Sequence, residues 1–354
     1  IPEGVTSIGG YAFYNSAKEI ILQSTTPAAL ESASLASSYS LFVVPAAAYN
    51  DYVTATYWAD MASQIIIDDV NARVKSVTLI AEEDKSALQL SIGDTNLKFV
   101  TDLTISGSIN SYDFMILRNK MPSLRHLNLE DATIVANAYE HYSGYCTQDN
   151  KFPGYGLYNC KLLSLIFPKN ITNVGYHGVA DNAILSDVTL FEGVSSIGSY
   201  AFYNCDALTA ITLPEGVTSI GESAFYSCGA LTNITFLDGL TSIGGRAFQY
   251  CSGLESVVLP PTVKTIENDA FRDCSNLTEI RIPSSIRSVG DNAFYCSNLN
   301  DVYVYTVEPI SIGQNTFFKS GNNFKGTLHA PKVSYWDYYY DTQWSQFASF
   351  AEFD

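Results

Sequence analysis

Basic residues are scarce in this chain of 354 residues. It contains 19 Lys and Arg against 36 Asp and Glu, which gives a formal net charge of −17 at pH 7. A surface this acidic repels phosphate backbones and anionic lipid headgroups, so nucleic acid and membrane-surface partners are disfavoured. No apolar run approaches the length that crosses a bilayer, so we expect no membrane-spanning segment. Because 47% of the residues are hydrophobic, a disordered chain is excluded.

Motifs for catalysis and for metal binding are also missing. Neither H-E-x-x-H, G-x-S-x-G nor a phosphate-cradling glycine loop occurs, and the four histidines are scattered, at His126, His141, His177 and His329. None of the seven cysteines stands two to four residues from another, as zinc ligands usually do. Acidic groups at residues 68–69 and 82–84 could collect calcium outside a cell, but no loop has EF-hand spacing. We therefore expect no enzyme, no cofactor and no metal site.

A 23-residue period organises most of the chain. Aliphatic residues recur at this spacing at Val174, Ile197, Ile220, Ile243, Ile266, Val289 and Ile312. A Phe follows five residues later in most copies. One such unit is too short to bury its own apolar face, so successive units have to stack along one axis. The period predicts a repeat solenoid with broad lateral surfaces, a geometry that suits binding better than catalysis.

Each repeat is interpreted as a strand, a turn, an apolar pair and a helical turn. In the copy that starts at Leu208, alternating apolar residues predict a short strand, and Pro214 marks the turn after it. Val217 and Ile220 form the apolar pair. The stretch around Phe225 is then expected to be a short helical turn that places the aromatic ring over the core.

Cysteine fills one slot of the repeat in several copies. The slot holds Cys205, Cys228, Cys251 and Cys274 at the 23-residue period, and Cys296 and Cys160 after one-residue shifts. Adjacent rungs should lie about 5 Å apart, so distance alone does not exclude disulfides. Asn182 fills the same slot in another rung, which favours a packing position for small side chains, because a buried free Cys behaves as a small hydrophobe. Cys146 lies outside this series.

The chain also contains a larger duplication. A tail with Pro45, Tyr49, Tyr52, Trp58 and Met61 is matched by a second tail with Pro331, Tyr335, Tyr338, Trp344 and Phe347. Residues 1–67 are therefore expected to be the carboxyl-terminal rung and cap of a first repeat unit, and the polar stretch 68–73 a linker. The chain begins inside a repeat, so the lack of a signal peptide at Ile1 carries no information about secretion.

The second unit is expected to run from residue 74 to residue 354. Its first part, 74–135, should be an amino-terminal cap, with strands at 77–80, 88–92 and 103–105 and a helix at 113–120. We expect a Tyr-rich insertion at 136–160, regular 23-residue repeats at 161–318 and a carboxyl-terminal cap at 319–354.

The repeat from Leu213 to Ile234, L-P-E-G-V-T-S-I-G-E-S-A-F-Y-S-C-G-A-L-T-N-I, resembles the BspA-like leucine-rich repeats of bacterial surface proteins of the Bacteroidetes type. The segment L-T-I-S-G-S-I-N-S-Y-D-F from Leu103 and the two aromatic tails are similar to cap elements of that family. The resemblance covers nearly the whole chain. It implies a β-rich right-handed superhelix with short helical turns and α/β caps, and secreted or outer-surface proteins linked to adhesion and host-protein binding.

Four residues depart from the repeat consensus. Val179 stands in the Phe slot, Phe191 and Leu237 stand in the Pro slot, and Glu267 stands in the Gly slot. These departures predict local irregularity within an otherwise regular fold.

Candidates for ligand binding lie where the repeat changes character. The outward residues of the strands change from small and polar to charged and aromatic toward the carboxyl end, at Glu279, Arg281, Asp301 and Tyr303. The Tyr-rich insertion supplies Tyr139, Tyr142 and Tyr145, although this loop could instead cover the first rungs. In the second tail, the candidates are the aromatics that have no counterpart in the first, namely Trp336, Tyr339 and Tyr340.

We therefore expect a non-catalytic interaction module, extracellular or on the outer cell surface, that acts as an adhesin. Its ligand would be a host extracellular-matrix or cell-surface protein, or a protein of a neighbouring cell. The alternative is a glycan-binding surface protein that captures nutrients through exposed Tyr and Trp. A structural spacer without a ligand of its own is a third interpretation.

Overall fold

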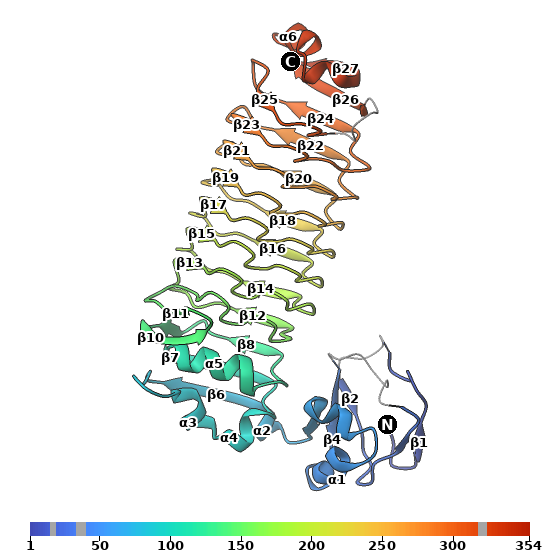
Figure 1. The fold of residues 1–354 in the computed structure, drawn as a ribbon, viewed down its shortest axis with the longest axis vertical. Coiled ribbons are helices and arrows are strands. Elements are labelled where there is room, and N and C mark those ends of the chain that lie inside the picture. Colours follow the sequence, from blue (N-terminus) through green and yellow to red (C-terminus); the bar gives the residue numbers. More distant parts are fainter. Residues whose placement is uncertain (15–18, 33–39, 318–323) are drawn as a thin grey trace.

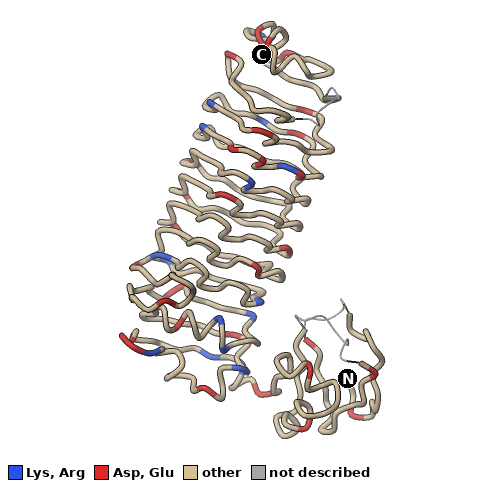
Figure 2. The backbone as a smooth tube through the Cα atoms, in the orientation of Figure 1, with Lys and Arg blue, Asp and Glu red and all other residues tan. Residues whose placement is uncertain are grey.

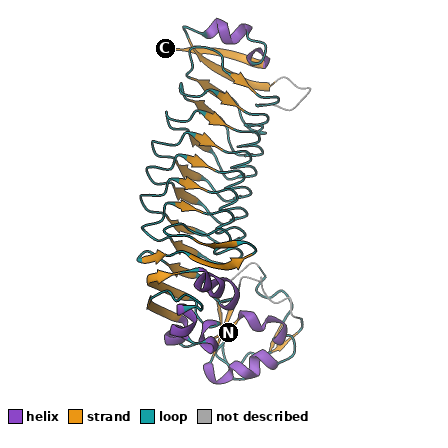
Figure 3. Cartoon of the chain, turned by 60° about the vertical axis from the view of Figure 1, so that its left-hand side comes forward, coloured by secondary structure: helices purple, strands orange, loops and turns teal. Residues whose placement is uncertain are grey.

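The chain forms a long column of stacked rungs with a smaller body beside its foot (Figure 1). The computed structural model describes residues 1–14, 19–32, 40–317 and 324–354. The boundary expected between residues 318 and 319 therefore lies outside the described residues. Most rungs consist of short strands joined by turns, and helices gather at the ends of the column and in the smaller body (Figure 3). The predicted repeat solenoid is confirmed.

The smaller body has a hydrophobic core of its own. Phe42, Tyr52 and Trp58 are fully buried in it. Strand β1 pairs with β3, and β4 lies between β2 and β5, all in parallel. The elements are β1 (Ser7–Ile8), β2 (Glu19–Ile21), β3 (Ala29–Leu30), β4 (Leu41–Val44), η1 (Ala46–Ala48), α1 (Tyr49–Thr54), η2 (Ala59–Gln64) and β5 (Ile65–Ile67). The division of the chain after residue 67 stays a prediction.

A parallel sheet and four helices form the foot of the column. The strand order is β14-β12-β8-β7-β6, with β9 beside β7. The elements are α2 (Val70–Arg73), β6 (Val74–Leu79), α3 (Ala87–Ile92), α4 (Asp94–Leu97), β7 (Asp102–Ile109), α5 (Ser111–Lys120), β8 (His126–Asn128) and β9 (Ala132–Ile134). Strands β6 and β7 and helix α5 agree with the pattern expected for this segment.

Residues 88–92, expected as a strand, form most of helix α3 instead. Ser86 caps the helix by accepting a hydrogen bond from the backbone N–H of Gln89 at 3.1 Å. Leu88 and Ile92 are buried, whereas Leu90 between them is 62% exposed. Residues i and i+4 share a side in both a helix and a strand, so Leu88 and Ile92 do not distinguish the two, and the apolar Leu90 between them favoured a strand. The strand prediction for this segment was wrong for that reason.

The Tyr-rich segment divides into a hairpin and a rung. Strands β10 (Asn137–Tyr142) and β11 (Tyr145–Thr147) pair antiparallel. Residues 150–160 instead stack on the next rung, where Leu157 donates its backbone N–H to the carbonyl oxygen of Gly178 at 2.8 Å. The hairpin, and not the whole segment 136–160, therefore stands outside the register of the rungs.

Two ladders of short parallel strands run along the column. The back ladder is continuous, and its strands are β13 (Asn173–Val174), β15 (Ser196–Ile197), β17 (Ser219–Ile220), β19 (Ser242–Ile243), β21 (Thr265–Ile266), β23 (Ser288–Val289) and β25 (Ser311–Ile312). The front ladder consists of β12 (Ser164–Ile166), β14 (Asp187–Thr189), β16 (Ala210–Thr212), β18 (Asn233–Thr235), β20 (Ser256–Val258), β22 (Glu279–Ile282) and β24 (Asp301–Val304). The front ladder carries the outward residues predicted to bind a ligand.

The front ladder is interrupted at two rungs. Among the described residues, β14 does not pair with β16, and β18 does not pair with β20. These are the two rungs in which Phe191 and Leu237 replace the proline of the consensus. The regular rungs that keep pairing with the next rung have the proline, at Pro168, Pro214, Pro260 and Pro283. Because proline confines the preceding residue to extended conformations, we infer that its absence contributes to these two breaks. Proline is not required at every rung, since β24 pairs with β26 although Tyr305 stands in this slot.

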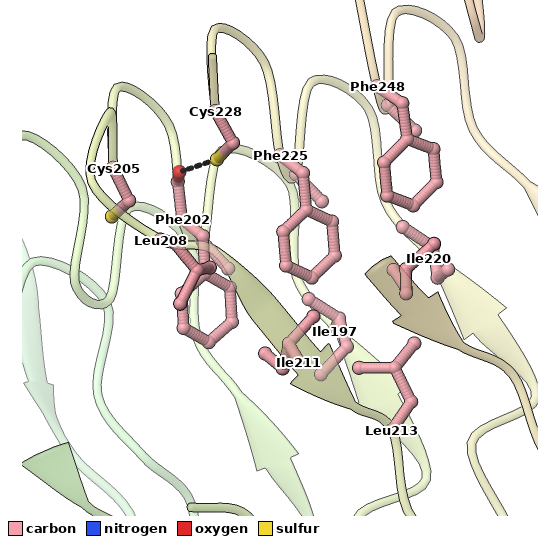
Figure 4. Packing of buried hydrophobic residues seen from close by; sticks show 14 of the residues in the cluster. Ile197, Phe202, Cys205, Leu208, Ile211, Leu213, Ile220, Phe225, Cys228 and Phe248 are labelled. Carbon is pink, nitrogen blue, oxygen red and sulfur yellow. Dashed lines mark hydrogen bonds between the residues drawn. The ribbon is translucent and has the colours of Figure 1, made fainter. Parts of the chain in front are cut away.

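Each regular rung buries its aliphatic side chains beside one phenylalanine ring (Figure 4). The rings of successive rungs stack almost parallel, and those of Phe225 and Phe248 have centres 5.2 Å apart and planes 5° apart. The stacked series is Phe202, Phe225, Phe248, Phe271, Phe294 and Phe317. Burial of one such side chain stabilises the fold by roughly 1.5–3 kcal/mol, so every rung contributes to one continuous core.

The stretch expected to be a short helical turn is a run of tight turns. The backbone N–H of Ala224 bonds to Gly221 O at 3.3 Å within the rung, whereas that of Phe225 bonds to Ala247 O of the next rung at 2.7 Å. Ser223 has a positive φ of 52°, which interrupts a right-handed helix. Successive N–H groups thus alternate between closing a turn and bonding to the next rung.

The seven cysteines are free thiols. Cys228 donates its thiol hydrogen to the carbonyl oxygen of Phe202 in the preceding rung, with 3.2 Å between sulfur and oxygen (Figure 4). The same bond recurs in four other rungs, from Cys205 to Val179, Cys251 to Phe225, Cys274 to Phe248 and Cys296 to Phe271. Asn182 places its Nδ2 donor 2.8 Å from a carbonyl oxygen as well, that of Leu157. The packing slot is therefore also a hydrogen-bonding slot, which explains why both Cys and Asn occupy it.

The top of the column repeats the cap of the smaller body. Trp344 donates its Nε1–H to Ile310 O at 2.9 Å, and Trp58 donates its own to Ala28 O at 2.8 Å. Each indole packs edge-to-face against a buried tyrosine, Trp344 against Tyr338 and Trp58 against Tyr52. The elements are β26 (Phe324–Pro331), α6 (Tyr335–Tyr340), η3 (Trp344–Gln346) and β27 (Phe347–Phe353). The duplicated aromatics pack the two caps in the same way.

Acidic residues are spread over the column and the smaller body (Figure 2). Among the described helices, none combines the length and the apolar character that a membrane span requires.

Candidate functional site

The four outward residues predicted on the carboxyl-side strands lie together on β22 and β24. The parallel register places Glu279 beside Asp301 and Arg281 beside Tyr303. Arg281 donates from Nε to Glu279 Oε1 at 2.7 Å, and the central carbon of its guanidinium group lies 4.3 Å from the centre of the Tyr303 ring. The residues between them are buried, so strand alternation turns these four side chains outward.

A histidine from the cap extends this group, and sequence analysis did not find it. His329 of β26 lies beside Tyr303 in the sheet, and the two rings stack with centres 4.1 Å apart. Its Nε2 lies 2.7 Å from Asp301 Oδ1. The interval from Tyr303 to His329 is longer than one repeat, so the period of the repeat does not identify this histidine.

Two more aromatic rings flank the same surface. Arg281 donates from Nη1 to the hydroxyl of Tyr305 at 2.9 Å, and Phe353 of β27 lies against Tyr305 with ring centres 5.1 Å apart. Tyr305 stands two residues after Tyr303, so strand alternation alone would have found it. We call the set of Glu279, Arg281, Asp301, Tyr303, Tyr305 and His329 the strand-face network.

The members of the strand-face network hold one another in place. The hydrogen bond that Arg281 donates to Tyr305 raises the pKa of the guanidinium most, and the hydrogen bond to Glu279 raises it further. The guanidinium therefore stays charged at any physiological pH. Desolvation, followed by the nearby carboxylates of Glu279 and Asp301, raises the pKa of Tyr303, so its hydroxyl stays protonated. Because the side chains are already fixed by these contacts, they would lose little further freedom on contact with a ligand.

The hairpin residues Tyr139, Tyr142 and Tyr145 lie over the foot of the column. Tyr139 stacks on Tyr112 of α5 with ring centres 4.0 Å apart and remains 39% exposed. Tyr142 and Tyr145 are half-buried and pack on Tyr155 of the first rung, at 4.4 and 5.0 Å between ring centres. The hairpin thus covers the first rungs, and Tyr139 is its most accessible ring.

A column of aromatic rings continues from the hairpin along the turns. The rings of Tyr155, His177 and Tyr200 stack face to face, with successive centres 4.8 and 4.7 Å apart. Burial lowers the pKa of His177, which favours the neutral ring in this stack. Because these ring faces are covered by the rings of neighbouring rungs, they cannot stack on a sugar.

Trp336, Tyr339 and Tyr340 are accessible on helix α6. They are 61%, 42% and 73% exposed, respectively. Their spacing of three and four residues places them on one side of the helix, and the centres of their rings lie 5.2 to 5.9 Å apart. The corresponding positions of α1 in the smaller body hold side chains that are not aromatic, Asn50, Val53 and Thr54. These three rings form the largest exposed aromatic group at the top of the column among the described residues.

An open depression of about 600 Å³ beside the back ladder contains several charged groups. Its carboxylates already have partners in the fold: Glu267 accepts a hydrogen bond from Gly245 N at 2.9 Å, and Asp269 pairs with Arg272 at 3.1 Å. In the part of the chain that the structure describes, no group of three or more His, Cys, Asp or Glu side chains could hold a metal ion.

Several solved structures are similar to this chain. A leucine-rich repeat protein from T. pallidum is 29% identical over 41% of this chain and 69% of its own length, with a TM-score of 0.39. One from Bacteroides ovatus is 18% identical over 81% of this chain and 70% of its own, with a TM-score of 0.48. A leucine-rich cell surface protein from Faecalibacterium prausnitzii is 23% identical over 59% of this chain and 62% of its own length, with a TM-score of 0.42. The search of curated proteins found no match.

The sequence pattern of the BspA-type leucine-rich repeat region matches this chain in six copies. The matched residues are 1–43, 150–260 and 218–335. They include the rung at 150–160 and the regular rungs with their cysteine and phenylalanine series. Because these matches span more than half of the 354 residues, the chain belongs to the BspA-type leucine-rich repeat family.

Proposed function

We propose that this chain is a non-catalytic adhesin module, extracellular or on the outer cell surface, that binds a protein of a host or of a neighbouring cell. The leucine-rich repeat fold supports a protein-interaction role, because a solenoid presents broad and rigid lateral surfaces. The single observation that carries the proposal is the strand-face network, in which an arginine and three aromatic rings are fixed on the outward side of the front ladder.

The chemistry of this network fits a protein partner. Arginine and tyrosine dominate the residues that contribute most to protein interfaces, and pre-organised side chains lose little entropy on binding. The middle rungs of the same ladder present small polar side chains such as Thr212 and Thr235, which offer no comparable anchor. The carboxylates of Glu279 and Asp301, together with the net charge of −17, favour a partner with a basic surface.

Surface plasmon resonance with purified matrix and cell-surface proteins tests this function. Tyr303→Ala should weaken binding at least about 30-fold, which corresponds to the roughly 2 kcal/mol of an interface hot spot. Arg281→Ala should act in the same direction, because it removes the cation that covers the Tyr303 ring. Thr212→Ala, in a middle rung of the same ladder, is the matched control and should leave binding unchanged.

Two results would contradict the proposal. A partner that binds Tyr303→Ala as tightly as the unaltered chain does not use this face. Failure to retain any protein of the panel at about micromolar concentration counts against an adhesin.

Glycan capture is a second candidate function, favoured by the exposed rings of Trp336 and Tyr340 on α6. Exposed aromatic faces stack on sugar rings, and a nutrient-capturing surface protein would use them in this way. A glycan array with Trp336→Ala and Tyr340→Ala tests it, with Tyr250→Ala as a control that removes an exposed ring from a rung. Saturable sugar binding that both α6 variants retain would reject this site.

We also propose the division of the chain into a first unit at residues 1–67, a linker at 68–73 and a second unit from residue 74. The separate hydrophobic core of the smaller body supports it. Limited proteolysis should cut first within 68–73 and release two fragments that resist further cleavage. First cleavage within a regular rung would contradict this division.

A further inference from the structure

Strand β27 forms an edge of the sheet at the top of the column. It pairs with β26 on one side, and among the described residues no strand pairs with its other side. Phe353 accepts a hydrogen bond from the backbone N–H of Lys332, just after β26, at 2.9 Å. Because alternate residues of a strand direct their backbone groups to opposite sides, Ala348, Phe350 and Glu352 direct their N–H and C=O groups away from β26.

The composition of β27 does not protect this edge. Edge strands usually carry lysine or proline, form a bulge or are very short, because unpaired backbone groups template the addition of another strand. Strand β27 has the sequence F-A-S-F-A-E-F over seven residues, with Glu352 as its single charged residue and without proline. Strand β6, at the opposite end of the column, carries Lys75. The unprotected edge at the top is therefore a candidate interaction surface.

We propose that two copies of this chain associate end to end through β27, which pairs antiparallel with β27 of the second copy about a two-fold axis. The five-stranded sheet β20-β22-β24-β26-β27 of one copy then continues into that of the other. A two-fold axis that passes beside Phe350 places Ala348 of each copy opposite Glu352 of its partner, and the two Phe350 residues opposite each other. The backbone N–H and C=O groups that point away from β26 in one copy then form hydrogen bonds with those of the other copy. The strand is thus complementary to itself, and no two carboxylates face each other across the pair.

Helix α6 adds apolar surface near the same edge. Tyr339 of α6 packs against Phe350 of β27, with ring centres 5.1 Å apart. The exposed rings of Trp336 and Tyr340 belong to the same helix. Aromatic side chains beside a paired edge give the contact an apolar component in addition to its backbone hydrogen bonds.

The net charge opposes this association at long range. Each copy carries −17 at pH 7, so two copies repel each other until salt screens the charges. The dimer should therefore strengthen as ionic strength rises. A complex held by opposite charges would show the reverse dependence.

Sedimentation equilibrium of the whole chain between about 1 µM and about 1 mM tests the proposal. The expected mass rises from 38.7 kDa toward twice that value, and does so at lower protein concentration when salt is increased. Glu352→Pro removes an outward N–H and no bond to β26, so it should raise the dissociation constant at least about tenfold. Glu352→Gln removes the carboxylate, keeps the N–H and should associate at least as tightly as the unaltered chain.

A constant mass of 38.7 kDa over this range overturns the proposal, as does a mass that grows beyond the dimer. A Glu352→Pro chain that associates as tightly as the unaltered chain also overturns it. So does a Glu352→Gln chain whose association is weakened as much as that of Glu352→Pro. Thermal unfolding shows whether Glu352→Pro is folded. If it is not, Ala348→Pro removes another outward N–H at the start of the strand, and unchanged association of that variant overturns the proposal equally.

Discussion

Replacing Phe191 with proline should join the front ladder where it is broken between β14 and β16. Phe191 occupies the slot that holds Pro214 one rung later, and β16 does pair with the rung that follows it. In the described part of the chain, the backbone N–H of Phe191 donates no hydrogen bond to another backbone group, so proline removes none. Proline would instead hold Leu190 in an extended conformation.

The expected gain in stability has two sources. Proline at a compatible position lowers the entropy of the unfolded chain and stabilises by about 0.4–1 kcal/mol. A restored hydrogen bond from Leu190 N to Thr212 O, equivalent to that of 3.1 Å from Leu213 N to Thr235 O, adds roughly 0.5–1.5 kcal/mol. Loss of the half-buried Phe191 ring offsets part of this, so we expect a net gain of about 1 kcal/mol in the free energy of unfolding.

Amide hydrogen exchange is the most direct assay, because a solenoid opens locally and the protection of one amide reports on its own rung. The Leu190 amide should become protected in Phe191→Pro, and the Phe236 amide in Leu237→Pro. Pro214→Ala is the matched control and should open the pairing of β16 with β18. If Leu190 stays unprotected while Phe191→Pro remains folded, the missing proline is not the cause of the break.

Three further predictions concern buried groups. Phe248→Ala should lower the free energy of unfolding by about 3–5 kcal/mol, because the ring is fully buried and its centre lies 5.2 and 5.1 Å from those of the rings on either side. Denaturant unfolding measures this, and a loss below about 1 kcal/mol would refute the stacked core. Burial raises the pKa of Cys160 to about 12 and that of Cys205 further, whereas unfolded thiols ionise near pH 8.5. The unfolded state then binds fewer protons, so stability should fall from about pH 9 upward, and rapid reaction of Cys205 with a thiol reagent in the folded chain would contradict this. Burial lowers the pKa of His141, whose Nε2 lies 2.8 Å from Gly154 O, so protonation of the unfolded chain below about pH 6.5 should destabilise the hairpin. Hydrogen exchange of β10 and β11 measures this, and His141→Gln should abolish the pH dependence; an equal dependence in that variant would assign it to other groups.

The stacking of the rungs could be predicted because it follows from one property of the sequence, its 23-residue period. Residues one period apart become neighbours, which fixes the back ladder, the phenylalanine series and the side of each strand that faces solvent. The departures at Phe191 and Leu237 coincide with the places where the front ladder breaks. Local propensity and periodicity agree at these positions, so the sequence determines the structure without further information. The irregularity predicted at Val179 and Glu267 was wrong, because both keep their backbone hydrogen bonds to the neighbouring rung.

The features that escaped prediction lie where the period does not hold. Residues 88–92 were too few to distinguish a helix from a strand by alternation, and the capping role of Ser86 decided between them. The rung at 150–160 has Leu157 in the phenylalanine slot, so its aromatics were assigned to an insertion. His329 reaches the strand-face network from the cap, more than one period after Tyr303, and its position depends on tertiary packing that no repeat encodes.

The alternating N–H groups of the turns have a consequence for how such columns change length. In the turns around the phenylalanine, alternate N–H groups of one rung bond to the rung that follows, as Phe225 does to Ala247, and the regular rungs offer equivalent acceptors. Insertion or deletion of one whole 23-residue repeat should therefore restore these turn bonds across the new junction. Such an event would move the strand-face network along the axis by about 4.8 Å while leaving its own geometry intact. Gain or loss of a whole repeat would thus change the position of this surface along the column in fixed increments, without changing the residues that form it.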